Sequence, residues 1–242
     1  MSHLSQRAVI RVSPRGEDDV AAFLQGLITN DVNGELPVYA ALLSAQGKTM
    51  FDFLVWRDEH ALLLDCERDQ AEALVKRLSL YRLRRPIDIE VDDTLAVHWS
   101  PGPIAKGSID PRLPELGYRW LERASPAVPV DDAWLAHRLG LGVPEGAGEL
   151  SDVLWLETNA IELNGVAFDK GCYIGQENTA RMNWRQKINR RLVVVPLAEL
   201  DEKRCKARYP AHDMAVELRR VADIDPAALP SWQATAVTTA LG

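Results

Sequence analysis

The feature that most constrains the fold is the order of short strand-like and helix-like stretches up to Trp99. Apolar and alternating patterns predict strands, while apolar residues at helical spacing predict a helix over 69–83. A turn at Gln46-Gly47 separates the first two strands. The predicted strands span 39–45, 48–56, 61–66, 87–91 and 95–99. From Phe51 the order is β-β-α-β-β, which favours an α+β lobe with an antiparallel sheet and helices on one side.

Two further helices are predicted outside this run. Acidic residues open the stretch 16–31, and its apolar residues have helical spacing. A shorter helix is expected over 131–140, with Asp131 or Asp132 as its N-cap. Six prolines between residues 101 and 129 exclude a long element, so this part is predicted to be a connector with one short strand near 117–121.

The C-terminal part has weaker patterns. Residues 190–197 are predicted to form a strand, because valines and leucine follow one another there. The stretches 214–224 and 232–241 are candidate strands. The N-terminal stretch before residue 13 is predicted to form the first strand of the fold.

Length and composition restrict the class of protein. The chain has 242 residues with 47% hydrophobic and 26% charged residues, which is typical of a folded chain with one large domain or two smaller lobes. A net charge of −7 disfavours direct nucleic-acid binding, which depends on neutralising phosphates. No apolar run is long enough to span a membrane, and the N-terminus lacks the apolar block of a secretory signal. We expect a cytoplasmic protein, or one of the mitochondrial matrix in a eukaryote.

The stretch DKGCYIGQENTAR, residues 169–181, contains the strongest candidate for chemistry. Cys172 lies between Gly171 and Gly175, and Lys170 precedes it by two residues. A nearby positive charge or a helix N-terminus favours the thiolate, which is the reactive form of cysteine. The alternative is that Cys172 is a small buried apolar residue, as most free cysteines are.

Cysteine and histidine spacing gives no support to other thiol chemistry. The three cysteines, Cys66, Cys172 and Cys205, are far apart and form no C-x-x-C pair, so we expect neither a disulfide framework nor a bound metal. They are also too few for an iron–sulfur cluster held by four cysteines of one chain. None of the histidines forms a recognisable local signature of a cysteine hydrolase with Cys172.

Arginines and aromatic residues near this motif suggest a second candidate feature, a binding site for an anionic ligand. Gln176 and Glu177 could satisfy helix N-terminal amides or bind a heteroaromatic ligand. The segment 181–191 carries five positive charges in eleven residues: Arg181, Arg185, Lys187, Arg190 and Arg191. Such a segment is either a solvated face or a pocket for carboxylates or phosphates. Trp134 and Trp184 lie near the motif in sequence, and an aromatic near arginines would suit a flat anionic ligand.

Several blocks together resemble a known family. KGCYIGQE at 170–177 resembles the signature of the YgfZ family of folate-binding proteins, which are related to the T-protein (aminomethyltransferase) of the glycine cleavage system and include iron–sulfur assembly factors. Further blocks resemble the family in order and spacing, at 23–32, 44–56, 110–121 and 137–146. The resemblance covers residues 7 to 195.

The resemblance implies an aminomethyltransferase-like, folate-binding α+β fold of interleaved lobes with antiparallel sheets. The expected folate-binding region is 1–191, with an inner α+β lobe at about 44–100. A small β-barrel is expected at 192–242, reduced because the chain is short after residue 195.

The family also implies a function. We expect a tetrahydrofolate-binding factor that assembles or repairs iron–sulfur clusters in client enzymes, with an indirect link to tRNA modification. Its partners would be those client enzymes or cluster-assembly proteins. Aminomethyltransferases carry an acidic residue where this chain has Cys172, which favours the cysteine-bearing branch. The alternatives are a non-catalytic adaptor that docks clients through 181–191, and a folate-dependent aminomethyltransferase.

Site residues follow from the same resemblance. Cys172 is the expected catalytic or cluster-handling thiol, and Trp134 matches a folate-pocket aromatic of that branch. The expected cofactor-binding residues are Trp134, Lys170, Tyr173, Gln176, Glu177 and Arg181. One departure is that the stretch before the first block lacks the N-terminal tryptophan that some relatives have in the pocket.

Overall fold

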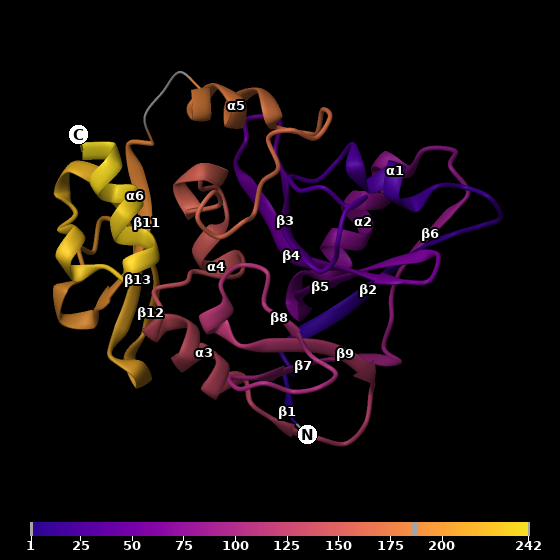
Figure 1. Ribbon diagram of the computed structural model, residues 1–242, viewed down its shortest axis with the longest axis horizontal. Coiled ribbons are helices and arrows are strands. Elements are labelled where there is room, and N and C mark those ends of the chain that lie inside the picture. Colours follow the sequence, from indigo (N-terminus) through magenta and orange to yellow (C-terminus); the bar gives the residue numbers. More distant parts are fainter. Residues whose placement is uncertain (1, 185–187, 242) are drawn as a thin grey trace.

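The computed structural model describes residues 2–184 and 188–241, and its framework is three β-sheets (Figure 1). The first sheet has the order β3-β4-β5-β2-β6 and is antiparallel throughout. Its strands are β2 (Arg7–Pro14), β3 (Val38–Leu43), β4 (Thr49–Asp58), β5 (Ala61–Glu67) and β6 (Ile87–Val91). The strands predicted up to residue 91 are therefore confirmed, including the turn at Gln46-Gly47.

Both faces of this sheet are buried. Helices α1 (Val20–Gln25) and α2 (Ala71–Arg82) cover one face, where Leu62 and Leu64 of β5 point. Leu63 points to the opposite face and joins the main core in the middle of the molecule. Burial on both faces explains why β5 is a continuous apolar run rather than an alternating one.

The helix predicted over 16–31 is much shorter in the structure. Asp19 caps α1 by accepting a hydrogen bond from the backbone N–H of Ala22, and the helix ends at Gln25, with Gly26 as its C-cap. The acidic residues before Asp19 therefore precede the helix instead of forming its first turn. The predicted helix was too long because the helical spacing of apolar residues continues through residues that pack in a turn.

The second sheet has the order β10-β1-β7-β9-β8, in which only β1 and β10 pair in parallel. Its strands are β1 (Ser2–His3), β7 (Leu95–Ser100), β8 (Ser108–Ile109), β9 (Tyr118–Arg123) and β10 (Val128–Pro129). The chain starts in this sheet, builds the first sheet, and then returns. β7 therefore lies in a different sheet from β6, and β9 is the short strand predicted within the proline-rich connector.

Helical segments connect the sheets. They are α3 (Asp131–Gly140), α4 (Ala147–Leu150) and α5 (Gln176–Trp184). Short 3-10 turns lie at η1 (Arg68–Gln70), η2 (Pro114–Leu116), η3 (Trp155–Thr158), η4 (Leu197–Glu199), η5 (Pro210–His212), η6 (Val221–Asp223) and η7 (Pro226–Ala228).

The predicted cap of α3 was wrong. Val130 is the N-cap residue and makes no side-chain cap bond. Asp131 instead accepts hydrogen bonds from the backbone N–H groups of Ser5 and Gln6 and from the Ser5 hydroxyl. Its carboxylate is used to hold the N-terminal segment, a long-range contact that helix patterns cannot reveal.

The C-terminal part forms the third sheet, which lies on the left in Figure 1 with α6 in front of it. Its strands, β11 (Arg190–Pro196), β12 (Cys205–Tyr209) and β13 (Met214–Arg220), have the order β11-β13-β12. The strand predictions for 190–197 and for the start of 214–224 are confirmed. Over residues 188–241 the structure shows this three-stranded sheet, and the expected barrel is not shown.

The strand predicted at 232–241 is a helix, α6 (Ser231–Leu241). Gln233 and Val237 are fully buried and one helical turn apart. The Gln233 amide donates hydrogen bonds to Asn159 Oδ1 and to the Leu192 carbonyl. Threonine hydroxyls on the outer face donate to carbonyls four residues earlier. The β-branched composition was misleading, because these tertiary contacts override strand propensity.

Within the described part of the chain, no helix is long and apolar enough to cross a membrane.

Candidate functional site

The loop before α5 presents Cys172 to solvent, while its neighbours are anchored. Cys172 is exposed, whereas Lys170 and Tyr173 on either side are buried. The Lys170 ammonium donates to the carbonyl oxygens of Ile28 (2.6 Å) and Asn30 (2.8 Å). It also lies 5.2 Å from the centre of the Tyr173 ring. The thiol is thus held at the surface by two buried side chains.

Burial changes the acid–base behaviour of these anchors. Burial lowers the pKa of Lys170 to about 8, and the carboxylate of Asp31 opposes this only in part. Burial also raises the pKa of Tyr173 to about 12. Lys170 therefore acts mainly as a structural donor to carbonyls that end the α1 region.

A close contact between two glycines fixes the other end of the loop. Gly175 has a φ of +81°, and a Cβ there would lie 2.5 Å from the Ser44 carbonyl oxygen and 3.1 Å from the Gly47 Cα. Gly47 has a φ of +78° at the turn between β3 and β4. Only glycine allows this approach, so Gly175 is needed for packing. Asn178 reinforces the contact by donating to the Gln46 carbonyl oxygen.

The other two cysteines are less suited to chemistry. Cys66 is buried in β5, and burial raises its pKa to about 12. Cys205 is half-buried at the start of β12. Cys172 is therefore the accessible thiol among the three cysteines, and the interpretation of Cys172 as a buried apolar residue is wrong.

The motif residues on α5 lie on its outer surface. Gln176 begins the helix, and Glu177 and Arg181 form an exposed ion pair of 2.8 Å one turn apart. Arg191 is buried and pairs with Glu162 at 2.8 Å. Of the basic segment 181–191, Arg185 and Lys187 lie outside the described residues.

Trp134 lies in a different place, within a buried network of charges. Its ring packs against the Arg119 guanidinium at 4.3 Å, and its indole N–H donates to Glu145 at 2.9 Å. Glu145 also accepts from Arg112 at 2.6 Å and from Arg119 at 3.2 Å. Arg7 joins the network through Asp65 at 2.6 Å. The Trp134 side chain thus contacts this network in two ways: its ring packs against an arginine, and its indole N–H donates to a carboxylate.

Opposite charges in the network lower the pKa values of two of its carboxylates, Glu145 and Asp110. Burial opposes the charged form of Glu145, but Arg112, Arg7 and Arg119 outweigh it and hold its pKa well below its usual range. Asp110 behaves in the same way, because Arg112 and Arg119 offset its burial and lower its pKa.

Asp52 is the exception in this region. Burial raises its pKa to about 6, although Arg7 opposes the shift. The Tyr39 hydroxyl donates to Asp52 Oδ2 at 3.3 Å, and the Gly146 N–H lies 3.5 Å from the same oxygen. Asp52 can therefore hold a proton near neutral pH. Asp52 could not be predicted as a site residue, because its position in an apolar strand gives no signal of its charged neighbours.

A small cavity opens beside this network. Its volume is about 160 Å³, and Trp134, Glu145 and Arg7 line it together with Glu67 and Tyr209. Drug-sized ligands occupy pockets of about 300–1,000 Å³, so this cavity suits a single planar ring system rather than a whole folate. Carboxylates and an indole are appropriate partners for an amino-substituted heteroaromatic ring.

The structure does not bring all the predicted site residues together. Lys170, Cys172 and Tyr173 form one loop, next to Gln176, Glu177 and Arg181 on α5. Trp134 is on α3, at the bottom of Figure 1, whereas α5 is at the top. None of the motif residues lines the cavity beside Trp134. Among the described residues, no group of His, Cys, Asp and Glu side chains could hold a metal ion.

Comparisons with known proteins identify relatives. No family model matches the chain. It is 36% identical over 234 residues to the iron–sulfur cluster assembly factor IBA57, mitochondrial, of Homo sapiens, which covers 79% of this chain and 65% of the relative. The corresponding protein of Mus musculus is 33% identical over 237 residues, covering 80% and 65%. The homologue from Neurospora crassa is 30% identical over 233 residues, covering 80% and 52%. The chain thus spans about half to two thirds of the length of these curated relatives.

A solved structure supports the fold. The glycine cleavage system aminomethyltransferase T from Bartonella henselae matches with a TM-score of 0.63, covering 91% of this chain and 78% of that one. Sequence identity is 12%, so this likeness concerns the fold alone. The prediction of an α+β, aminomethyltransferase-like fold with antiparallel sheets is confirmed.

Proposed function

Because this chain is similar to mitochondrial iron–sulfur cluster assembly factors over four fifths of its length, we propose that it is an iron–sulfur cluster assembly factor with Cys172 as its working thiol. The observation that carries the proposal is the contrast between an exposed thiol and its buried anchors, Lys170 and Tyr173. A thiol that exchanges iron or sulfur with a partner must be reachable and held in place. Cys172 meets both conditions.

One chain supplies one suitable thiol, and that restricts the role. An iron–sulfur cluster is held by about four ligands, usually thiolates. Cys172 would therefore act on a cluster shared with a client enzyme or an assembly protein that supplies the other ligands. The relatives are mitochondrial by name, which supports the matrix alternative for location and gives no support to the cytoplasmic one. Any effect on tRNA modification would be indirect, through client enzymes.

This proposal can be tested by producing the Cys172→Ser variant in cells that lack the native chain. The activity of iron–sulfur enzymes is then measured in extracts of these cells. We expect Cys172→Ser to fold normally and to lose most of the support for client activity. Cys205→Ser is the matched control, since it removes a less accessible thiol, and should retain that support. Full client activity with Cys172→Ser would remove the thiol from the mechanism.

A folate site is the second part of the proposal. The cavity beside Trp134 fits one ring system, so we place the pterin ring of tetrahydrofolate there, with Glu67 and Glu145 as acceptors for its amino groups. The remainder of the molecule would extend out of the cavity, past lining residues such as Gln6 and Asp131. When bound, the folate would supply a one-carbon acceptor. The protein's own groups bind and orient the ring and exclude water from it.

Calorimetric titration of the reduced protein with tetrahydrofolate tests this site. We expect saturable binding by the native chain. Binding by Trp134→Phe should be at least about tenfold weaker, because this variant keeps an aromatic side chain but loses the hydrogen bond from the indole N–H to Glu145. Thermal unfolding of the variant shows whether the fold is retained. Absence of binding by the native chain would reject the folate site while leaving the thiol proposal intact.

A non-catalytic adaptor is a second candidate function, and one observation favours it. Trp184, at the end of α5, is 75% exposed and stands at the start of the basic stretch. Exposed tryptophans next to arginines are typical of protein-binding hot spots. Loss of client association in Trp184→Ala, with client support retained in Cys172→Ser, would favour the adaptor. The third candidate, an aminomethyltransferase, is supported by the fold alone.

A further inference from the structure

The end of α2 exposes leucines in a way that folding does not require. Leu83 is 84% exposed and Leu80 is 61% exposed. Leu83 also has a φ of 52° and a ψ of −114°, a conformation that favours glycine. Leu83 therefore combines a strained backbone conformation with an exposed apolar side chain. Folding favours neither of these, and such positions are expected at functional surfaces.

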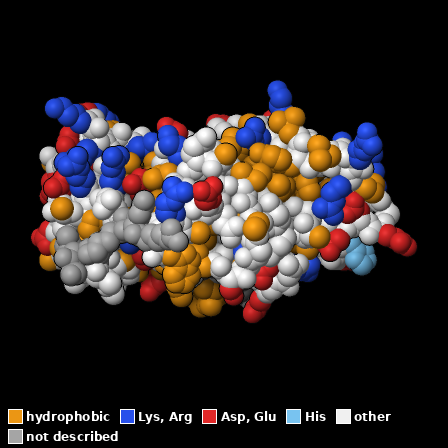
Figure 2. All heavy atoms as spheres, turned by 90° about the horizontal axis from the view of Figure 1, so that it is seen from above, with side chains coloured by type: hydrophobic (Ala, Val, Ile, Leu, Met, Phe, Trp, Pro, Cys, Tyr) orange, Lys and Arg blue, Asp and Glu red, His pale blue; other side chains and the backbone are white. Residues whose placement is uncertain are grey.

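Positive charges surround these leucines. Residues 73–87 contain five cations and no carboxylate. Among the described residues, only Arg85 of these five forms an ion pair, with Asp18 at 2.5 Å. Lys76 and Arg84 are exposed. We call the exposed surface of Lys76, Leu80, Leu83 and Arg84 the basic tip. On the right half of the face in Figure 2, hydrophobic side chains lie among Lys and Arg side chains.

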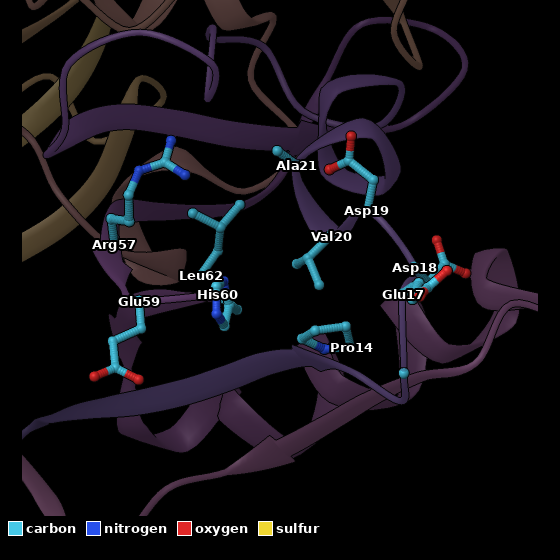
Figure 3. Close-up of a pocket in the computed structure, with 11 residues that line it drawn as sticks. Pro14, Glu17, Asp18, Asp19, Val20, Ala21, Arg57, Glu59, His60 and Leu62 are labelled. Carbon is cyan, nitrogen blue, oxygen red and sulfur yellow. The ribbon is translucent and has the colours of Figure 1, made fainter.

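A pocket of opposite character adjoins the chain segment that follows the basic tip. Figure 3 shows the residues that line this pocket. Its volume is about 370 Å³. We call it the acidic pocket: apolar side chains of Pro14, Val20 and Leu62 line its interior, and carboxylates of Glu17, Asp18, Asp19 and Glu59 stand around them. Glu17 and Glu59 have no cationic partner in the described part of the chain. Arg57 also lines the pocket, but its guanidinium donates to the Val32 carbonyl oxygen.

The chain segments next to the basic tip and to the acidic pocket contact each other directly. The backbone N–H of Arg15 donates to the Pro86 carbonyl oxygen at 2.6 Å. Pro14 and Gly16, on either side of Arg15, line the acidic pocket. The Arg85–Asp18 ion pair also joins the segment of the tip to the rim of the pocket. The basic tip and the acidic pocket, both with apolar side chains at their centre, therefore lie side by side on one molecule.

We propose that a second copy of this chain covers this surface, in a two-fold dimer in which the basic tip of each protomer fills the acidic pocket of the other. Adjacent complementary surfaces suit a two-fold axis, because one rotation forms both contacts at once. Leu83 would enter the apolar interior of the pocket, while Arg84 and Lys76 would meet Glu17 and Glu59. The proposal goes beyond the assembly function above and does not depend on it.

An anionic lipid surface is the main alternative occupant, and the structure disfavours it. A membrane would use the basic tip alone, and the acidic pocket beside the tip would be repelled by the same surface. A second copy uses both surfaces. The complementarity of charge therefore favours the dimer.

Sedimentation velocity of the full chain over a concentration series, at low and high salt, tests the proposal. We expect a monomer–dimer equilibrium that high salt weakens, because opposite charges contribute to it. Leu83→Asp and Arg84→Glu should each weaken the dimer by more than about tenfold. Val128→Asp is the matched control, since Val128 is 73% exposed but lies on β10, and should dimerise like the native chain.

A charge exchange makes the test specific for the two-fold arrangement. Arg84→Glu and Glu17→Lys should each be monomeric alone, whereas an equimolar mixture should form a heterodimer, because both contacts then join opposite charges. All these positions are exposed, so the variants should keep the native unfolding temperature. A native chain that stays monomeric, a dimer that Leu83→Asp and Arg84→Glu leave unchanged, or a mixture that stays monomeric would each overturn the proposal. Flotation of the monomer with phosphatidylglycerol vesicles would assign the tip to lipid instead, and would also overturn it.

Discussion

Burial raises the pKa of Asp52 to about 6, whereas nearby arginines lower the pKa values of Glu145 and Asp110. The usual pKa of Asp52 is 3.8, so the folded state binds its proton more tightly than the unfolded chain does. The resulting stability is fully present below the unfolded pKa and is lost as pH rises through about 6. The buried carboxylate therefore costs stability at neutral pH, which is a common feature of functional sites.

The Asp52→Asn variant tests this at the residue scale. The amide cannot ionise, so between pH 4 and pH 7 the native chain should lose about 2–3 kcal/mol of unfolding free energy relative to the variant. Urea unfolding of both proteins over that pH range measures the difference, and other titrating groups cancel in it. Parallel pH profiles for the two proteins would contradict the raised pKa.

At the scale of elements, the contact between Gly175 and Gly47 joins the motif loop to the β3–β4 turn. Both glycines have a positive φ, and the backbones approach so closely that neither position has room for a Cβ without movement. Gly171, on the other side of Cys172, has no atom within 4 Å of an added Cβ. The two glycines of the motif thus have different roles, although the sequence presents them as a pair.

Gly175→Ala should therefore destabilise the protein, while Gly171→Ala should not. The first adds a Cβ 2.5 Å from a backbone oxygen at a φ of +81°, and we expect a loss of about 2–4 kcal/mol. The second should change stability by less than about 0.5 kcal/mol. Chemical unfolding of both variants provides the comparison, and equal effects would show that the backbone contact is not what fixes the loop.

At the scale of the whole molecule, Glu149 connects three parts of the fold. It is fully buried on α4, and it accepts from Arg138 of α3 at 2.7 Å and from the hydroxyl of Tyr209 of β12. Its second oxygen accepts from the Glu145 N–H at 2.9 Å, next to the charged network. The Glu149 carboxylate is therefore one of the buried contacts that attach the C-terminal sheet to the cavity region.

Glu149→Ala should loosen this attachment strongly. It leaves the buried Arg138 without its partner, and breaking a buried pair costs about 3–5 kcal/mol. Tyr209→Phe is the milder control, because it removes one hydrogen bond and should cost about 1 kcal/mol. Urea unfolding measures both, and limited proteolysis shows whether the C-terminal sheet becomes accessible first. Similar losses for the two variants would place the attachment elsewhere.

Local sequence patterns were enough to predict the α+β class, the strands up to residue 91 and the helices α2 and α3, because apolar periodicity reports directly which face of an element is buried. The sequence also singled out the motif around Cys172, since two glycines and a thiol in one short loop are not needed for a core. The resemblance of KGCYIGQE to the YgfZ family led to the proposal of an assembly role, which the names of the relatives support.

Other features of the fold and of the site depend on tertiary contacts. The pairing of β7 with the second sheet, the helix at 231–241 and the role of Asp131 depend on partners far along the chain, which local patterns do not contain. The same holds for the buried charge network around Trp134 and for the raised pKa of Asp52, because the shift of a pKa depends on burial and on neighbouring charges. Separation of Trp134 from the Cys172 loop is likewise a consequence of how the sheets and helices pack, and no spacing in the sequence could have shown it.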